Sequence, residues 1–259
     1  VGYDNVDVRA AGALGIPVCN VPDYGVDEVA DHAIGMMLAC MRGFVIAERR
    51  LRTASVLKPW DRHDVGPVRR LADSTLGIIG CGRIGSATAL RAKALKMRVL
   101  INDPYLRPGM EKVLGVERVS LETLLAESDA VSLHTPLTEE TRELINATTL
   151  AQMKTSACLI NTARGAVVDT IALAEALRAR RIAGAGIDVL PVEPPMIDDP
   201  LIQLWQTNEE PPINLMITPH TAYYSEAGLL EIREKSSAEV ARVLRGEMPW
   251  NLVNGEWLK

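Results

Sequence analysis

The stretch that decides the fold is Gly80-Cys81-Gly82-Arg83-Ile84-Gly85, which fits the pattern G-x-G-x-x-G. The apolar run Leu76–Gly80 predicts a short buried strand before it, and the Ala-rich stretch Ile84–Lys96 predicts a helix after it. Asp103 stands 18 residues after Gly85, at the end of the next apolar run. This order of strand, glycine turn, helix and acidic residue is the fingerprint of a dinucleotide-binding unit.

The residues of this loop are expected to serve the dinucleotide in different ways. Gly80 permits a tight turn, Gly82 lets the backbone approach a pyrophosphate, and Gly85 lets the helix pack closely on the strand. The N-terminus of the following helix adds partial positive charge for the phosphates. Arg83 and Ile84, at the start of that helix, are therefore expected cofactor contacts as well.

Asp103 predicts which dinucleotide is bound. Its carboxylate would accept hydrogen bonds from both adenosine ribose hydroxyls and would repel a 2′-phosphate, which favours NAD (NADH) over NADP. Arg107 could in principle bind a 2′-phosphate, but with Asp103 ahead of it we interpret Arg107 as a solvent-facing side chain. Cys81 is interpreted as a small residue that fills the tight turn, although a redox role is conceivable.

From about residue 76 onward, apolar runs alternate with stretches of helical periodicity. Continuous apolar runs are typical of strands that are buried on both faces of a parallel sheet. The alternation predicts an α/β fold, a Rossmann-type doubly wound parallel sheet with right-handed crossovers. Further strands are expected at Arg98–Asn102, Ala130–Leu133, Ala157–Asn161, Ala183–Val189 and Asn214–Thr218, with helices at Leu121–Glu127, Ala147–Met153 and Ile171–Arg180.

Two long helices are predicted to flank this unit, at Asp27–Thr53 and Ser225–Arg245. Two other stretches lack a regular apolar pattern and contain several prolines, which is typical of connections between elements. We interpret these stretches, Lys58–Arg70 and Pro191–Pro212, as linkers.

Composition excludes several other classes of protein. The chain has 259 residues and 47% hydrophobic residues, enough for the core of one large or two modest domains. The aromatic content of 4% and the net charge of -5 argue against a nucleic-acid partner. With no apolar run of about 18 residues and no secretory signal pattern, no membrane association is expected. The four cysteines lack zinc-site or disulfide spacing, which predicts thiols, no bound metal and a cytoplasmic location.

Polar segments follow three of the expected strands. Residues 161–165 read Asn-Thr-Ala-Arg-Gly, residues 188–194 read Asp-Val-Leu-Pro-Val-Glu-Pro, and residues 218–222 read Thr-Pro-His-Thr-Ala. In an open α/β sheet, ligands bind beyond the carboxyl ends of the strands, so these segments are expected to converge on the cofactor crevice. Together they offer an arginine (Arg164) that could bind a ligand's carboxylate, a titratable base (His220), and a carboxylate (Glu193) that could orient that base.

At these residues the chain resembles the D-isomer-specific 2-hydroxyacid dehydrogenase family, and the similarity runs along essentially the whole sequence. It rests on the G-x-G-x-x-G loop, the turn His134–Thr138 and the three polar segments. Asp103-Pro104-Tyr105 and the stretch His220–Glu226 are most similar to the branch that contains the C-terminal-binding-protein corepressors. The resemblance implies an NAD-dependent oxidoreductase that interconverts a small D-2-hydroxy acid and its 2-oxo acid by hydride transfer.

The resemblance also implies which residues carry the chemistry. His220 would give a proton to the C2 oxygen of a 2-oxo acid, Glu193 would hydrogen-bond its other ring nitrogen, and Arg164 would bind the substrate carboxylate. Further cofactor contacts are implied at Thr135, Pro136, Thr141, Ala163, Arg164, Asp188 and His220, and further substrate contacts at Val1, Gly2 and Tyr223. The remaining histidines, His32, His63 and His134, are interpreted as structural.

Members of this family carry a separate, flavodoxin-like substrate domain, formed mainly by their N-terminal part. The resemblance places residues 1–24 at the end of that domain, residues 25–218 in the NAD-binding domain, and residues 219–259 in a segment that returns to the substrate domain. Most of the substrate domain is therefore expected to be missing from this sequence. The resemblance also implies a homodimer through the apolar helix Ala33–Met41, which by itself would expose a large apolar patch.

A rival function from another class shares all of these motifs. An NAD(H)-sensing, corepressor-like dimeric interaction protein would use the same fold with weak or no turnover. A bare dinucleotide-binding module is a third possibility. Because the enzyme and the sensor share every motif, turnover of 2-oxo acids is the observation that separates those two, whereas a gene that starts near Val1 would indicate the bare module.

Overall fold

A computed structural model describes residues 2–53, 60, 62–65, 68–207 and 211–258. The chain forms two compact units. One, the sheet unit, comprises Val29–Ala222, and the other, the terminal unit, combines the residues up to Glu28 with those from Tyr223 onward. The predicted domain boundaries, after residues 24 and 218, lie four residues before each of these divisions. The assignment of the terminal unit to a substrate domain stays a prediction.

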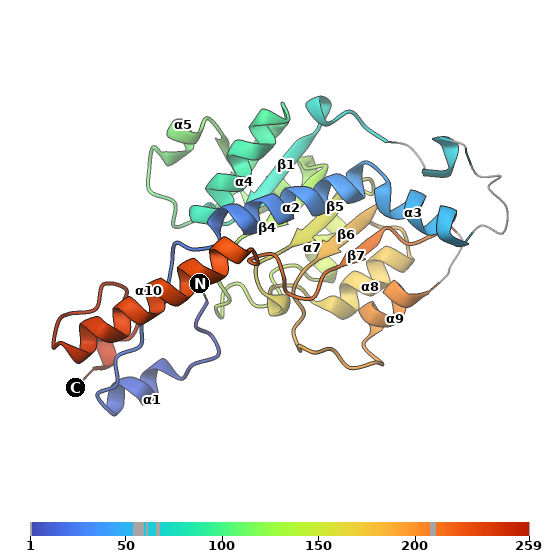
Figure 1. The fold of residues 1–259 in the computed structure, drawn as a ribbon. Helices are drawn as coiled ribbons and strands as arrows, with labels where there is room; N and C mark the ends of the chain where they lie inside the picture. Colours follow the sequence, from blue (N-terminus) through green and yellow to red (C-terminus); the bar gives the residue numbers. More distant parts are fainter. Residues whose placement is uncertain (1, 54–59, 61, 66–67, 208–210, 259) are drawn as a thin grey trace. The chain divides into compact units, whose positions relative to one another are not determined.

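The sheet unit is built on seven parallel strands in the order β3-β2-β1-β4-β5-β6-β7 (Figure 1). Chain order reverses between β1 and β4, where a doubly wound sheet opens its crevice for a dinucleotide. The predicted Rossmann-type α/β fold is confirmed. The strands are β1 (Thr75–Ile79), β2 (Arg98–Asn102), β3 (Glu117–Arg118), β4 (Ala130–Leu133), β5 (Cys158–Asn161), β6 (Gly184–Ile187) and β7 (Leu215–Ile217).

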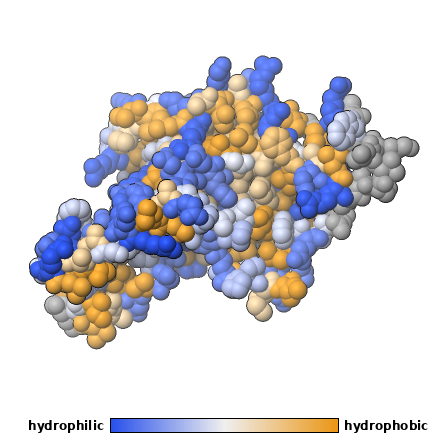
Figure 2. Space-filling model, in the orientation of Figure 1, coloured by the Kyte–Doolittle hydropathy of each residue, from blue (hydrophilic) through white to orange (hydrophobic). Residues whose placement is uncertain are grey.

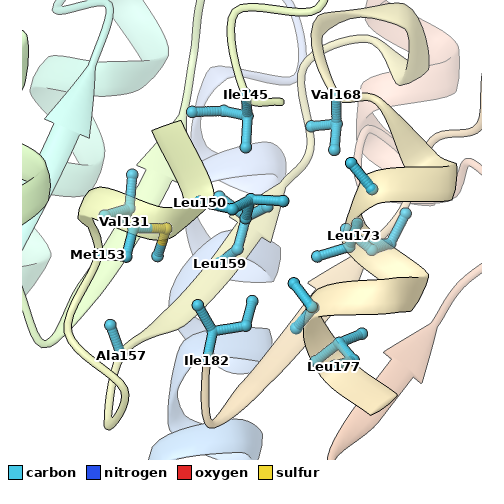
Figure 3. Packing of buried hydrophobic residues seen from close by; sticks show 14 of the residues in the cluster. Val131, Ile145, Leu150, Met153, Ala157, Leu159, Val168, Leu173, Leu177 and Ile182 are labelled. Carbon is cyan, nitrogen blue, oxygen red and sulfur yellow. The ribbon is translucent and has the colours of Figure 1, made fainter. Parts of the chain in front are cut away.

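Helices pack against both faces of this sheet, which is why every residue of its central strands β1, β4, β5 and β6 is buried. On one face, α6, α7 and α8 pack on every second strand residue, such as Val131 and Leu159. Figure 3 shows Leu150 of α7 and Leu173 of α8 pointing toward Leu159 of β5. The helices of this unit are α2 (Val26–Met41), α3 (Phe44–Thr53), α4 (Arg83–Ala94), α5 (Met110–Leu114), α6 (Leu121–Glu127), α7 (Ala147–Gln152), α8 (Thr170–Arg178) and α9 (Pro200–Gln206).

The opposite face of the sheet is covered by α2 and α4. Ala33, Met36, Met37 and Cys40 of α2 are at most 3% exposed, and they pack with the alternate strand residues, such as Ile78. The expectation that this helix would expose a large apolar patch is therefore wrong, because the sheet of the same chain covers its apolar side. An exposed apolar patch on this helix therefore no longer supports a homodimer, which stays a prediction.

The single long helix predicted over Asp27–Thr53 is also wrong. The chain forms α2 and α3, which are bent by 63° at a short break. Gly43 lies in this break with φ +70°, a conformation that glycine adopts without steric cost. The apolar pattern continues into Phe44, so periodicity did not indicate the break. Among the described residues, no single helix is long and apolar enough to cross a membrane, and only the bent pair α2 and α3 together meets that test.

Several short elements were not predicted, namely β3, α5, α9 and, in the terminal unit, α1 (Val8–Ala13). α9 lies inside the supposed linker Pro191–Pro212. It begins at Pro200, where the Asp199 carboxylate accepts hydrogen bonds from the N–H groups of Leu201 (2.9 Å) and Ile202 (3.1 Å). Parts of both predicted linkers lie outside the described residues, and so does the side chain of His63.

The terminal unit consists of α1, the long helix α10 (Glu226–Leu244) and the segments around them. Asn254 is fully buried and joins these segments, because it accepts from the Val18 N–H (2.8 Å) and donates to the Ile16 carbonyl (2.9 Å). Figure 2 shows hydrophobic residues gathered on the surface of this unit, near α1 and the end of α10. The large exposed side chains of this unit include Leu14, Leu244 and Trp250, with 76%, 81% and 76% of their surface exposed.

Candidate active site

The glycine loop joins β1 to α4 at the carboxyl edge of the sheet. Gly80 has φ +87°, and a Cβ added there would lie 2.6 Å from the carbonyl oxygen of His134. A Cβ on Gly85 would overlap the Gly80 carbonyl oxygen. At Gly82, in contrast, no described residue lies within 4 Å of an added Cβ. The loop is therefore tight where the chain packs on itself and open at the position predicted to meet a pyrophosphate.

The start of α4 and the end of β2 frame this loop. Gly82 is the N-cap of α4 and offers no side-chain cap, so the first N–H groups of the helix keep their partial positive charge. Arg83 is exposed and Ile84 is half-buried in this first turn. Asp103 follows β2, and its two oxygens accept from the backbone N–H groups of Cys81 (2.8 Å) and Tyr105 (2.8 Å). These two bonds fix the carboxylate beside the loop.

His134 ends β4 and takes no part in a charged cluster. Burial of its ring lowers the pKa to about 4, so the imidazole is neutral at physiological pH. Its Nε2 lies 2.9 Å from the hydroxyl oxygen of Ser132. This neutral, hydrogen-bonded state agrees with the structural interpretation of His134.

The turn after His134 packs on the glycine loop. The methyl group of Thr135 would lie 2.9 Å from a Cβ on Gly80. The Thr135 hydroxyl oxygen is buried without a hydrogen-bond partner among the residues that the structure describes. Thr141 closes the turn, because its hydroxyl donates to the Pro136 carbonyl (2.6 Å) and accepts from the Thr138 N–H (2.8 Å). A rigid turn thus brings an unsatisfied hydroxyl to the glycine loop.

The turn after β5 carries Arg164. The side chain of Asn161 holds this turn, since it accepts from the Ala163 N–H (3.0 Å) and donates to the Arg164 carbonyl (2.9 Å). Arg164 is half-buried, and its Nη1 donates to the Ala163 carbonyl (2.7 Å). Thr162 was not among the predicted site residues. Its buried hydroxyl has no partner in the described part of the chain, a signal that only the structure reveals.

The Arg164 turn packs on the segment that carries Glu193. A Cβ on Gly165 would overlap the backbone of Leu190, so the two turns touch at their backbones. Oε1 of Glu193 accepts from the Leu190 N–H (2.8 Å), and Oε2 lies 2.6 Å from Nδ1 of His220. The three predicted catalytic residues thus come from the turns after β5, β6 and β7. Glu193 and His220 are in direct contact, and Arg164 joins them through the packing of its turn.

Asp188 ends β6 and is 2% exposed. Its carboxylate accepts from the hydroxyl of Thr218 (2.5 Å) and from the N–H groups of Thr221 (2.9 Å) and Ala222 (3.0 Å). All three donors belong to the turn that carries His220, whose φ of +53° is unusual for a residue with a side chain. Asp188 was predicted as a cofactor contact, and in the structure its oxygens hold this turn.

The predicted substrate contacts other than Arg164 belong to the terminal unit. Val1 is outside the described residues, and Gly2 is exposed. Tyr223 is half-buried and makes an edge-to-face contact with Tyr24, with ring centroids 6.3 Å apart. The roles of these residues toward a substrate stay predictions.

The carboxyl edge of the sheet fits a dinucleotide. It combines the open position at Gly82, an uncapped helix N-terminus, two unsatisfied buried hydroxyls and the fixed carboxylate of Asp103. Within the described ranges, no group of three or more His, Cys, Asp or Glu side chains is placed to hold a metal ion. The four cysteines are free thiols.

Comparison with known proteins gives the same assignment. The NAD-binding domain of the D-isomer specific 2-hydroxyacid dehydrogenase family matches residues 34–222. Two curated relatives are similar over the whole of this chain, the glyoxylate reductases of Korarchaeum cryptofilum (strain OPF8), 44% identical, and of Thermofilum pendens (strain DSM 2475 / Hrk 5), 41% identical. The aligned region covers 75% and 74% of these two proteins.

A solved structure extends the similarity to the fold. The crystal structure of D-lactate dehydrogenase from Aquifex aeolicus, complexed with NAD and lactic acid, superposes with a TM-score of 0.87 at 35% identity. The match covers 98% of this chain and 78% of that one. The predicted cofactor and enzyme class are confirmed, whereas the corepressor-like branch stays a prediction. The chain belongs to the D-isomer-specific 2-hydroxyacid dehydrogenase family and is an NAD-dependent oxidoreductase that interconverts a D-2-hydroxy acid and its 2-oxo acid.

Proposed function

We propose that the chain reduces a small 2-oxo acid, glyoxylate foremost, with His220 as the proton donor. The observation that carries this proposal is the 2.6 Å contact between Nδ1 of His220 and Oε2 of Glu193. Because the carboxylate accepts the Nδ1 hydrogen, Nε2 is the ring nitrogen that would exchange a proton with the substrate. The two curated relatives are glyoxylate reductases, which supports glyoxylate as the acid.

Glu193 is suited to orient the ring of His220. One of its oxygens is held by the Leu190 N–H, so the carboxylate cannot rotate freely away from the imidazole. A fixed acceptor at Nδ1 selects the tautomer and the ring orientation that the proton transfer needs. General acid catalysis by such a group contributes about 10²–10⁴-fold to the rate.

Arg164 is proposed to bind the substrate carboxylate. Its planar guanidinium carries five N–H donors, enough to hold the Ala163 carbonyl and a carboxylate at the same time. A bidentate contact would fix the direction in which the 2-oxo group points. The position of the Arg164 turn against the Glu193 segment supports this division of roles.

When bound, NADH supplies the hydride that the C2 atom of the oxo acid accepts. The open position at Gly82 and the uncapped start of α4 support a pyrophosphate there, and Asp103 would bind the adenosine ribose hydroxyls. Val1, Gly2 and Tyr223 are the proposed additional substrate contacts. The proposed cofactor contacts are Gly80, Gly82, Arg83, Ile84, Gly85, Asp103, Thr135, Pro136, Thr141, Ala163, Arg164, Asp188 and His220, to which the unsatisfied hydroxyl of Thr162 is added.

The test measures NADH oxidation with glyoxylate, pyruvate, hydroxypyruvate and phenylpyruvate. We expect the highest kcat/KM with glyoxylate, and we expect His220→Gln to lower kcat by about 10²–10⁴-fold because the proton donor is lost. Glu193→Gln should also lower kcat. The matched control Asp198→Asn, which removes an exposed carboxylate from the same segment, should keep the wild-type kcat.

Binding of NADH, followed by its fluorescence, separates the two functions that share this fold. Tight NADH binding by the wild type with no turnover of any acid would favour the NAD(H)-sensing interaction protein. Full turnover in His220→Gln would reject His220 as the proton donor.

A homodimer and a cytoplasmic location belong to the same proposal. Phe44 and Leu51, two turns apart on α3, are 59% and 38% exposed. A second copy of the chain would cover this apolar surface, which supports the dimer.

A further inference from the structure

A chain of hydrogen bonds links α2 to the turn that carries His220. Nε2 of His32 lies 3.0 Å from Oγ1 of Thr218 and 3.6 Å from Oδ1 of Asp188. Oγ1 of Thr218 donates in turn to Oδ1 of Asp188 at 2.5 Å. The side chain of His32 is 25% exposed and that of Asp188 is 1% exposed, so this series of hydrogen bonds runs from a partly exposed position on α2 into the interior.

The directions of these hydrogen bonds follow from the chemistry of the groups. Only donors surround the Asp188 carboxylate, which is the environment of an ionised acid that can only accept. The single hydrogen of the Thr218 hydroxyl is therefore committed to Asp188. The Thr218 oxygen can then only accept from His32, which must carry its hydrogen on Nε2.

The far end of this series of hydrogen bonds fixes the backbone at His220 and at the two residues after it. Thr221 and Ala222 donate their N–H groups to the two Asp188 oxygens, and the His220 N–H donates to the Asp188 carbonyl (2.8 Å). His220 itself has φ +53°, a conformation that residues with side chains adopt only when their surroundings hold them there. The Asp188 carboxylate therefore holds the backbone that carries His220, while Glu193 orients its ring.

We propose that His32 is a positioning residue for His220, acting through Thr218 and Asp188. By donating to Thr218, it directs the Thr218 hydroxyl hydrogen onto Asp188 and keeps the carboxylate aligned with the two N–H groups of the turn. His32 does not touch the reacting atoms, and its effect is on the geometry of the proton donor. The proposal rests on the role of His220 given above.

The first test compares His32→Leu with His32→Gln. Leucine cannot donate to Thr218, so kcat for glyoxylate should fall by about tenfold or more as His220 loses its fixed position. The KM for NADH should change by a smaller factor than kcat, because the glycine loop and Asp103 are unchanged. His32→Gln places an amide N–H in reach of Thr218 and should restore most of the lost kcat. The matched control is Asp31→Asn, which changes the neighbour of His32 on α2, breaks its ion pair with Arg91 of α4 and should leave kcat unchanged.

The second test uses Thr218→Val, which keeps the side-chain shape and removes the hydroxyl. It should lower kcat as His32→Leu does, and the double variant should be no worse than Thr218→Val alone, because both act through one chain of bonds. Thr218→Ser should restore the activity. Independently of turnover, the amide hydrogens of Thr221 and Ala222 should exchange with solvent faster in His32→Leu than in the wild type.

These measurements separate failure of this inference from failure of the proposed function. If His220→Gln is inactive while His32→Leu keeps the wild-type kcat and amide exchange, His32 has no positioning role. Strictly additive losses in the double variant would also overturn the proposal. If His220→Gln remains active, the proposed function itself fails, whatever His32→Leu does.

Discussion

Two buried aspartates stand at opposite edges of the same sheet and are held in different ways. Asp129 precedes β4 at the amino edge and is 4% exposed, and Asp188 follows β6 at the carboxyl edge and is 2% exposed. Asp129 binds the Thr75 N–H (2.9 Å) and two cations, Arg69 (2.9 Å) and Lys154 (3.0 Å). Asp188 accepts its hydrogen bonds, in contrast, from the hydroxyl and backbone N–H groups of one short turn.

The difference shows what each carboxylate does. The long side chains of Arg69 and Lys154 neutralise the charge of Asp129, but they are flexible and can be hydrated instead. The backbone N–H groups that bind Asp188 belong to the turn itself, so these hydrogen bonds fix the conformation of that turn. The amino edge also opens a cavity of about 450 Å³, lined in part by Asp129, Arg69 and Asn214. The dinucleotide loop and the pair Glu193 and His220 lie at the other edge, so this cavity is not part of the candidate active site.

Of the variants that test this comparison, Asp188→Asn is expected to have the largest effect. The amide replaces one of the two acceptor oxygens by a donor, so the N–H group of either Thr221 or Ala222 loses its acceptor and the turn can no longer keep its shape. We expect kcat to fall by about 10²-fold, the cost of misplacing a catalytic group by about 1 Å. Steady-state kinetics with glyoxylate, and circular dichroism to confirm folding, would check this. Wild-type turnover in a folded variant would show that the turn holds its shape without the carboxylate.

A smaller effect is expected from His134, a half-buried titratable residue at the carboxyl edge whose Nε2 lies 2.9 Å from the neutral Ser132 hydroxyl. Burial lowers its pKa to about 4 from the usual 6.5, so the unfolded chain takes up this proton at higher pH than the folded one. The free energy of unfolding should therefore decrease by about 3 kcal/mol on this account as pH falls from 6.5 to 4. Urea unfolding at several pH values, in the wild type and in His134→Asn, would measure it.

The His134→Asn variant lacks the titrating ring, so its stability should depend less on pH in this range. Equal slopes for the two proteins between pH 4 and 6.5 would mean that the folded chain protonates His134 without cost. A variant that is destabilised equally at all pH values would point to its hydrogen bond with Ser132 instead.

The sequence alone was sufficient where the signal is local. The glycine loop, its flanking strand and helix, and Asp103 follow one another within a short stretch, and each has a residue type that its conformation requires. The central strands were predictable because burial on both faces makes them continuously apolar. The family resemblance then paired Glu193 with His220, and the structure places their polar atoms 2.6 Å apart.

The parts that could not be predicted depend on contacts between distant residues or on the backbone. His32 and Thr218 are 186 positions apart, and nothing near His32 in the sequence indicates its partner. The unsatisfied hydroxyl of Thr162 is visible only once its surroundings are built. The end of α2 depends on the positive φ of Gly43, and a single glycine within an apolar pattern does not by itself indicate a break.

The smallest effect is expected from Asp129→Asn, the counterpart of the Asp188 variant at the amino edge. The asparagine carbonyl can still accept from the Thr75 N–H, and the lost ion pairs involve Arg69 and Lys154, whose side chains are 61% and 33% exposed and can be hydrated. We therefore expect a loss of about 1–2 kcal/mol in the free energy of unfolding and an unchanged kcat. Urea unfolding and glyoxylate turnover on the same preparation would measure both. A fall in kcat comparable with that of Asp188→Asn would mean that the two edges are coupled through the sheet, and the contrast between a charge-balancing and a turn-fixing carboxylate would not hold.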